Sequence, residues 1–204
     1  MNNPIFVTTL SLLKYNPIKA TSSPKAINTT ITNLNNLNPT NPYSKTKALA
    51  DLLVLEYYKK YDLNVTISRS SNNYGPNQYP EKLIPLVINK VKNNESIPLY
   101  GNGLNKRDWL YVLDNVEAID LIVNKGKKGG IYNISSNNEL TNLEVVKLIL
   151  NKLNKDESLI TYVKDRENHD YKYTMDISKI INELNWVPKY SFELGINEIL
   201  KEED

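Results

Sequence analysis

The stretch Pro42–Gly75, PYSKTKALADLLVLEYYKKYDLNVTISRSSNNYG, decides the fold. Its first part, Tyr43–Tyr61, repeats apolar residues at helical spacing without internal glycine or proline, which predicts a helix. Leu63–Arg69 alternates and is rich in β-branched residues, which predicts a strand. A polar turn, Ser70–Pro76, follows at once. This succession is typical of α/β layering, in which ligands bind beyond the carboxyl ends of strands.

Helices and strands keep alternating after this stretch, so we expect an α/β fold throughout. The further predicted strands lie at 107–113 and 130–135. The further predicted helices are 81–93 with Pro85 in its first turns, 114–124 capped by Asp114, the helix behind a Thr141–Glu144 capping box that reaches Leu153, and two that open at Asp176 and Ser191.

Composition narrows the classes of function. The chain has 204 residues and a formal net charge of +2, so no overall field attracts nucleic acid or an anionic membrane. It has no cysteine and a single histidine, His169, which argues against thiolate chemistry and a metal centre. No stretch approaches the length of an apolar membrane span, and the opening lacks the basic start of a signal peptide. We therefore expect a cytoplasmic protein without nucleic-acid, membrane or metal partners.

The amino-terminal segment differs from the rest. The first 50 residues contain no Asp or Glu, whereas the remainder contains all 23. Residues 1–37 are rich in Asn, Thr, Ser and Pro and lack sustained periodicity, apart from a short run at Ile5–Leu13 that predicts one strand or helix. We expect 1–37 to be a divergent, poorly patterned segment.

Tyr43 and Lys47 lie four residues apart, so they share one face of the predicted helix one turn apart. An ammonium near a phenol favours the phenolate, which lets the tyrosine exchange a proton with an alcohol at neutral pH. The lysine can also donate hydrogen bonds to cofactor hydroxyls. Taken alone, the pattern is weak, because Tyr and Lys four residues apart occur often in helices and are usually a solvated pair.

Asn72 and Asn73 follow the predicted strand. Two adjacent carboxamides offer donors and acceptors without the desolvation cost of a charge, which suits a phosphate or a carboxamide ring. A plain turn is the alternative.

Further polar residues stand among apolar ones. A guanidinium is a natural partner for a diphosphate, and Arg107 and Arg166 are two of only three arginines in the chain. Surface ion pairs are the alternative for both, and a hydrogen-bonded loop residue is the alternative for His169. We expect Trp109 and Tyr111 to lie in the core. The other candidates are Lys82, Tyr100 and Asn142.

Five segments together resemble one family of the extended short-chain dehydrogenase/reductase superfamily, the dTDP-glucose 4,6-dehydratases. The resemblance covers about residues 38–200, roughly the carboxyl-terminal half of a family member. The segments, in order, are PYSKTKALAD (42–51), SNNYGPNQYPEKLIPLVI (71–88), IPLYGNGLNKRDWLYVLDNVEAI (97–119), GIYNISSNNELTNLEVV (130–146) and DRENHDYKYTMD (165–176).

The resemblance implies a partial NAD-binding Rossmann-type parallel sheet with a smaller α/β substrate-binding lobe. Residues 38–80 would be the remnant of the NAD domain, and 81–204 mainly the nucleotide-sugar lobe. Tyr43 and Lys47 match the YxxxK pair, in which the tyrosine takes the sugar C4 hydroxyl proton as hydride passes to NAD. Family members commonly form dimers through the helix that bears this tyrosine.

Further positions match by resemblance alone. Asn73, with Tyr43 and Lys47, matches the cofactor contacts. The positions that match contacts to the substrate are Asn72, Lys82, Leu83, Pro98, Leu99, Tyr100, Arg107, Asn142, Asp165, Arg166, Glu167, Asn168 and His169. Glu167 and Asn168 depart from the family's DRPGHD pattern.

Two family features are absent from this sequence. One is the GxxGxxG turn that seats the NAD pyrophosphate at a helix N-terminus. The other is the Thr-Asp-Glu triplet, which supplies the acid and the base for elimination. Nothing at Thr8–Asn16 can replace two carboxyl groups at neutral pH. We therefore expect a truncated or split gene product that is inactive alone and needs a separate chain supplying the amino-terminal half.

Two alternatives stay open at this point. A UDP-sugar 4-epimerase or decarboxylase of the same superfamily shares the Tyr–Lys pair and does not need the carboxyl pair. A non-catalytic nucleotide-sugar-binding fragment would keep the substrate contacts without turnover.

Overall fold

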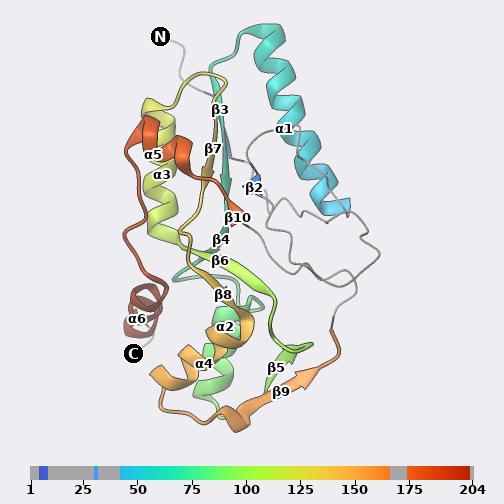
Figure 1. The fold of residues 1–204 in the computed structure, drawn as a ribbon, viewed down its shortest axis with the longest axis vertical. Helices are drawn as coiled ribbons and strands as arrows, with labels where there is room; N and C mark the ends of the chain where they lie inside the picture. Colours follow the sequence, from blue (N-terminus) through green and yellow to red (C-terminus); the bar gives the residue numbers. More distant parts are fainter. Residues whose placement is uncertain (1–4, 9–29, 32–41, 166–173, 203–204) are drawn as a thin grey trace.

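A computed structural model describes residues 5–8, 30–31, 42–165 and 174–202 (Figure 1). The strands are β1 Ile5–Thr8, β2 Thr30–Ile31, β3 Val65–Ser70, β4 Asn72–Tyr74, β5 Ile97–Tyr100, β6 Lys106–Tyr111, β7 Ile131–Ile134, β8 Glu139–Thr141, β9 Ile160–Val163 and β10 Thr174–Met175. The helices are α1 Pro42–Tyr61, α2 Leu83–Lys92, α3 Val112–Lys125, α4 Asn142–Lys152, α5 Ser178–Leu184 and α6 Phe192–Glu202, with a short 3₁₀ turn at Glu157–Leu159.

A three-stranded parallel sheet, ordered β1–β3–β7, forms the first layer. α3 and α5 cover one face of this sheet, and α1 lies on the other side (Figure 1). Every residue of β3 is buried, as expected for a parallel strand covered on both faces. The predicted α/β fold with parallel strands is confirmed.

Smaller sheets make up the rest of the molecule. β6 pairs with β4 in parallel and with β8 antiparallel, whereas β5 pairs with β9 in parallel. β2 pairs with β10. α2 and α4 pack together beside β5 (Figure 1). The predicted division near residue 81 stays a prediction, and β7 returns from beyond that point to the β1–β3 sheet.

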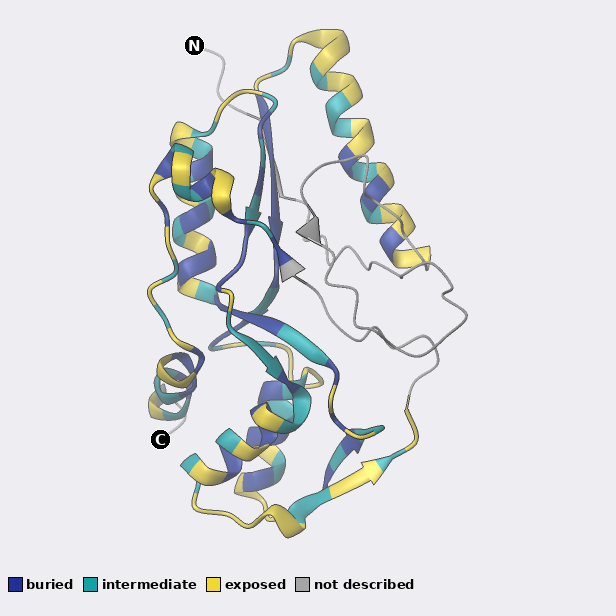
Figure 2. Ribbon diagram, viewed as in Figure 1, coloured by how far each residue is buried: buried dark blue, intermediate teal, exposed yellow. Residues whose placement is uncertain are grey.

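β6 separates two hydrophobic cores. Trp109 and Tyr111 belong to one core, with α2, α4 and α6, while Leu110 belongs to the other, with α3, α5 and β7. Successive residues of a strand point to opposite faces, so one short strand contributes to both cores. Figure 2 shows β6 buried along much of its length between the two parts. The prediction that Trp109 and Tyr111 lie in the core is confirmed.

Of two predicted helix caps, the structure confirms one and contradicts the other. The Thr141–Glu144 capping box is present in full at α4. The prediction that Asp114 caps a helix is wrong, because α3 already begins at Val112. The Asp114 carboxylate instead accepts hydrogen bonds from the backbone N–H groups of Lys189 and Tyr190, both at 3.0 Å. A residue with good capping chemistry is therefore used for a tertiary contact.

α6 lies against a cluster of aromatic rings that includes Tyr74 and Phe192. The Tyr74 hydroxyl donates a hydrogen bond to the Phe192 carbonyl at 3.2 Å, and burial raises the pKa of this phenol. Gly195 allows the close approach, because a Cβ atom there would collide with the Tyr74 hydroxyl and lie 2.9 Å from a Tyr111 ring carbon.

We expect Gly195→Ala to lower the free energy of unfolding by about 1–3 kcal/mol, because the added methyl overpacks this contact by more than the helix-propensity gain can offset. Leu194→Ala, at an exposed site on the same helix, is the control and should change stability by less than about 0.5 kcal/mol. Urea unfolding measures both. A Gly195→Ala variant as stable as the unmodified protein would contradict this packing.

Candidate functional site

Tyr43 and Lys47 lie in the first two turns of α1. The Lys47 ammonium sits 5.7 Å from the centre of the Tyr43 ring, within cation–π range. Tyr43 is 47% exposed and Lys47 is half-buried, so the phenol can reach a ligand while the ammonium stays beside it. The structure thus places the pair as the four-residue spacing predicts.

The buried side of α1 consists of Ser44, Ala48 and Asp51. The Asp51 carboxylate accepts a hydrogen bond from Nε of Arg69 on β3 at 2.8 Å, and the two side chains are 0% and 2% exposed. This ion pair was missed by sequence reasoning. The one sequence pattern that could indicate it is the spacing of Ser44, Ala48 and Asp51 at i, i+4 and i+7. This spacing places them on one face of the helix, opposite its apolar stripe.

The predicted turn at Ser70–Pro76 is wrong in part, because Asn72–Tyr74 form the short strand β4. The segment 71–78, the asparagine turn, is held by its own amides. Asn73 Nδ2 donates to the Ser71 carbonyl at 3.2 Å, and Gln78 Nε2 donates to the Asn73 carbonyl at 2.9 Å. Each side-chain NH₂ group donates to a backbone carbonyl, which assigns the amide orientation and turns the amide oxygens away from these hydrogen bonds.

Three buried oxygens of this turn have no hydrogen-bond partner within the described part of the chain. They are Ser71 Oγ, Asn73 Oδ1 and Gln78 Oε1. Leaving a buried acceptor unsatisfied costs about 1–3 kcal/mol, so such atoms favour a ligand that donates hydrogen bonds. Gln78 is a candidate that the sequence reading did not select.

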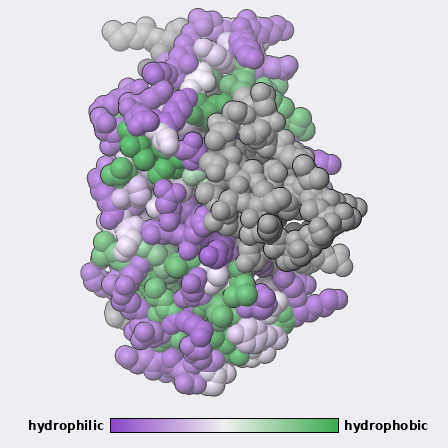
Figure 3. Space-filling view, in the orientation of Figure 1, coloured by the Kyte–Doolittle hydropathy of each residue, from purple (hydrophilic) through white to green (hydrophobic). Residues whose placement is uncertain are grey.

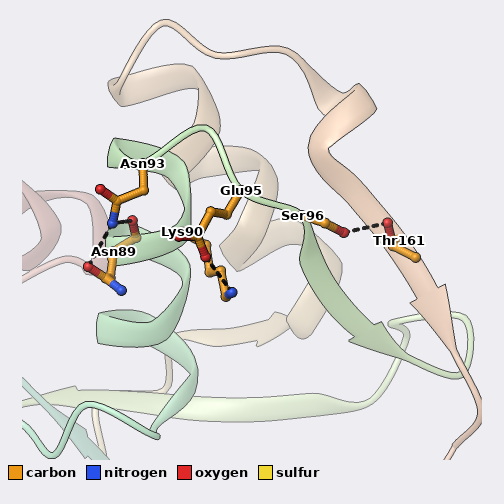
Figure 4. Close-up of polar contacts among 6 residues, drawn as sticks. All are labelled: Asn89, Lys90, Asn93, Glu95, Ser96 and Thr161. Atoms are coloured by element: carbon orange, nitrogen blue, oxygen red, sulfur yellow. Dashed lines mark hydrogen bonds and ion pairs between the residues drawn. The ribbon is translucent and has the colours of Figure 1, made fainter.

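The predicted segment Pro98–Tyr100 forms β5, beside β9. The Ser96 and Thr161 hydroxyls join the two strands at 2.6 Å (Figure 4). The turn that leads from α2 into β5 is held by a 2.5 Å ion pair between Lys90 and Glu95, also drawn in Figure 4.

Gly101 brings the end of β5 against Asp165. Its backbone φ is +59°, and a Cβ atom there would lie 2.8 Å from the Asp165 carboxylate. The chain after β5 and the chain after β9, far apart in the sequence, therefore meet at Gly101 and Asp165. The candidates Arg166, Glu167, Asn168 and His169 lie outside the described residues.

The antiparallel pairing of β6 with β8 places the strand of Arg107 beside the strand that leads into Asn142. Arg107 is paired with Leu140, and Lys106 with Thr141, immediately before Asn142. The Asn142 N–H donates to the Asn105 carbonyl at 3.1 Å. Lys82 is exposed at the start of α2, 3.5 Å from Glu81, and Leu83 is half-buried beside it.

A buried carboxylate supports the strand that carries Arg107. Asp108 accepts hydrogen bonds from the hydroxyls of Ser135 and Ser136, the latter at 2.8 Å, and from the Asn138 N–H at 3.1 Å. Three donors therefore hydrogen-bond to this one carboxylate. This network fixes β6 against the 135–138 loop and was also missed from sequence.

Across the described ranges, no helix has the length and apolarity needed to cross a bilayer. The same residues contain no group of three His, Cys, Asp or Glu side chains placed to hold a metal ion.

Comparisons with known proteins agree on one family. A model of the GDP-mannose 4,6 dehydratase family matches residues 25–199. The low-salt glycan biosynthesis protein Agl12 of Haloferax volcanii is 48% identical over 160 residues, covering 78% of this chain and 51% of that protein. A dTDP-glucose 4,6-dehydratase of Haemophilus influenzae is 45% identical over 174 residues, covering 80% and 52%.

A solved structure gives the same result. The dTDP-glucose 4,6-dehydratase of Bacillus anthracis in complex with NAD superposes with a TM-score of 0.82 at 47% identity, covering 87% of this chain and 57% of that one. The expected Rossmann-type fold and its family are thereby confirmed. The chain spans about half the length of the curated relatives it matches.

The capping box beside Asn142 gives a stability prediction. Hydrogen bonds from the Thr141 N–H and hydroxyl lower the pKa of Glu144. We expect Thr141→Ala to lower the free energy of unfolding by about 1 kcal/mol at pH 7. Thr141→Ser is the control, and it should keep most of the stability that the cap contributes. A carboxyl whose pKa is lowered by folding stabilises above its unfolded pKa and loses this contribution as the pH falls through its folded pKa. The difference between the unmodified protein and the Thr141→Ala variant should therefore narrow towards about pH 3 in urea titrations; a constant difference would contradict the box.

Proposed function

This chain belongs to the GDP-mannose 4,6 dehydratase family, and from that we propose that it is the nucleotide-sugar-binding and Tyr–Lys half of a dTDP-glucose 4,6-dehydratase acting in the cytoplasm. The supporting observation is the pairing of distant segments. Gly101, at the end of β5, lies against Asp165, and the strand of Arg107 pairs with β8, which leads into α4. A site for a diphosphate sugar would draw polar groups from several such segments.

The protein would bind the substrate mainly through the diphosphate group. Arg107 supplies the guanidinium, and Asn72 and Asn142 supply neutral hydrogen-bonding groups from neighbouring site segments. Pro98–Tyr100 and Asp165, held together at Gly101, would contact the nucleoside end. The residues Lys82, Leu83 and 166–169 complete the set implied by the family.

NAD suits the polar turn after β3. The unpartnered acceptors Ser71 Oγ, Asn73 Oδ1 and Gln78 Oε1 fit a ligand rich in N–H and O–H donors, which a nicotinamide carboxamide and ribose provide. Asn73, Tyr43 and Lys47 would hold this end of the cofactor. When bound, NAD supplies a hydride acceptor. The pyrophosphate end needs a glycine-rich turn, which this sequence does not contain.

Tyr43 would act on the sugar C4 hydroxyl. As a general base, it takes the hydroxyl proton onto its phenolate oxygen. The Lys47 ammonium lies 5.7 Å from the centre of the Tyr43 ring and is the charged group beside this phenol. Removal of the C6 hydroxyl further requires an acid and a base, and the first carboxylate in the sequence, Asp51, is already paired with Arg69. Turnover would therefore require a segment with a glycine-rich turn and two carboxyl groups, which we propose comes from a separate chain.

The missing carboxyl pair also favours a second candidate. A UDP-sugar 4-epimerase or decarboxylase uses the Tyr–Lys pair without that elimination step. Mixing the chain with an amino-terminal half, NAD and either dTDP-glucose or a UDP-sugar distinguishes the two, because only the dehydratase forms the 4-keto-6-deoxy product. Nucleotide binding without any product would leave the third candidate, a non-catalytic binding fragment.

A second copy of this chain is the partner we propose for α1. Leu49, Leu52 and Leu53 are 63%, 47% and 55% exposed, and Tyr57 continues the same stripe one turn on. Hydrophobic side chains reach the surface on the side where α1 lies (Figure 3). A helix with its apolar stripe turned away from its own core is typical of helix pairing between subunits.

Arg107 gives a direct test of substrate binding. We expect the chain to bind dTDP, and Arg107→Ala to weaken binding at least about tenfold through loss of charge-assisted hydrogen bonds. Lys125→Ala, which removes an exposed cation on α3, is the control and should leave the affinity unchanged. Isothermal titration calorimetry measures all three proteins. Unchanged affinity in the Arg107 variant would remove this residue from the site.

Association through α1 has its own test. We expect Leu53→Glu to convert a dimer to a monomer, because it places a charge in the centre of an apolar contact. Leu113→Glu, at an exposed leucine on α3, is the matched control. Light scattering after gel filtration reads the mass. A dimer that survives Leu53→Glu, or one that Leu113→Glu breaks, would contradict the assignment.

A further inference from the structure

The buried pair Asp51–Arg69 lies between the helix that carries Tyr43 and the strand that leads to the asparagine turn. Asp51 is one turn beyond Lys47 and just over two turns beyond Tyr43 on α1. Arg69 is the penultimate residue of β3, just before the turn that holds Asn72. The 2.8 Å contact therefore joins the two halves of the candidate site through the protein interior.

Among the described residues, the amino-terminal part of α1 buries only two small side chains besides Asp51. Ser44 and Ala48, the other two buried residues of the helix, are small and define no strong rotational preference. The carboxyl-terminal part is held differently: Tyr58 packs on Gly129, and Asp62 pairs with Lys128 at 2.5 Å on the surface. The large apolar side chains at 49, 52 and 53 face outward.

Stability alone is a weak reason for such a pair. Burying two charges costs several kcal/mol per ion, and apolar residues of similar volume often serve a fold as well or better. Here the cost is raised further, because Arg69 Nη2 is also buried without a hydrogen-bond partner in the described part of the chain. A directional contact, by contrast, sets the rotation and depth of a helix in a way that apolar packing does not.

We infer that Asp51 and Arg69 are positioning residues for the reaction of the proposed function. Their contact sets how α1 sits on β3, and so where the Tyr43 hydroxyl and Lys47 ammonium stand relative to the asparagine turn. A displacement of about 1 Å at reacting groups is enough to slow a reaction about 100-fold.

The deciding variant replaces both charges by apolar residues of similar size, Asp51→Leu with Arg69→Met. The full chain is studied, with the amino-terminal half added for kinetics. We expect a folded protein in which kcat falls about 100-fold while the KM for dTDP-glucose changes less than about threefold. Amides of residues 43–50 should exchange hydrogen at least about tenfold faster, while those of β3 keep their protection.

Two further variants keep the test decisive if this double variant does not fold. Arg69→Lys keeps the positive charge, so this variant should keep much of the kcat of the unmodified protein. Asp51→Asn keeps the shape of the side chain but removes its charge, so its kcat should fall. Asp62→Ala breaks the surface ion pair at the other end of α1 and is the control, with kcat unchanged. Folded charge-free variants with full kcat, or with unaltered exchange in 43–50, would overturn the inference.

The proposed function and this inference can fail separately. If the unmodified protein with its amino-terminal half forms no product, the proposed function falls. Faster exchange confined to residues 43–50 in the double variant would still uphold the positioning role, and unaltered exchange would reject it.

Discussion

Burying a carboxylate and a guanidinium together is costly, and the placement of α1 depends on this contact. Asp51 and Arg69 meet at 2.8 Å where α1 crosses β3, and both are almost fully shielded from water. A buried ion pair with one partner displaced would leave an uncompensated charge, so the arrangement is all-or-none. The helix is thereby held in one rotation, with its small residues inward, its apolar stripe outward, and the exposed Tyr43 beside the half-buried Lys47. Figure 2 shows that the buried positions of α1 lie in its amino-terminal half.

The rest of the molecule is organised around β6 in a similar way. This strand buries Trp109 and Tyr111 in one core and Leu110 in the other, so neither core can shift without moving it. Asp108 ties the same strand to the 135–138 loop through three hydrogen-bond donors. Arg107, the neighbour of Asp108, therefore lies on a rigid element, which would suit the diphosphate-binding role that we propose for it.

The elements with strong local signals could be predicted from sequence. The helix at 42–61, the buried strand after it and the Thr141–Glu144 capping box follow from periodicity, β-branched residues and capping chemistry. Asp114 shows the limit of local rules: its side chain is suited to a helix cap, yet it binds two backbone N–H groups 75 and 76 residues later. The parallel pairing of β5 with β9 has the same character, because its register depends on packing between distant segments.

The candidate site likewise has a part that local sequence signals predict and a part that depends on contacts between distant segments. The Tyr–Lys pair is local, since a spacing of four on a helix places two side chains together, and sequence alone predicts it. The approach of Gly101 to Asp165, and the pairing of β6 with the strand that precedes Asn142, require the fold. Binding a diphosphate sugar needs several such distant groups at once, whereas proton transfer needs only a few correctly placed atoms. A chain can therefore carry many residues suited to substrate contacts independently of whether it carries the carboxyl groups for elimination.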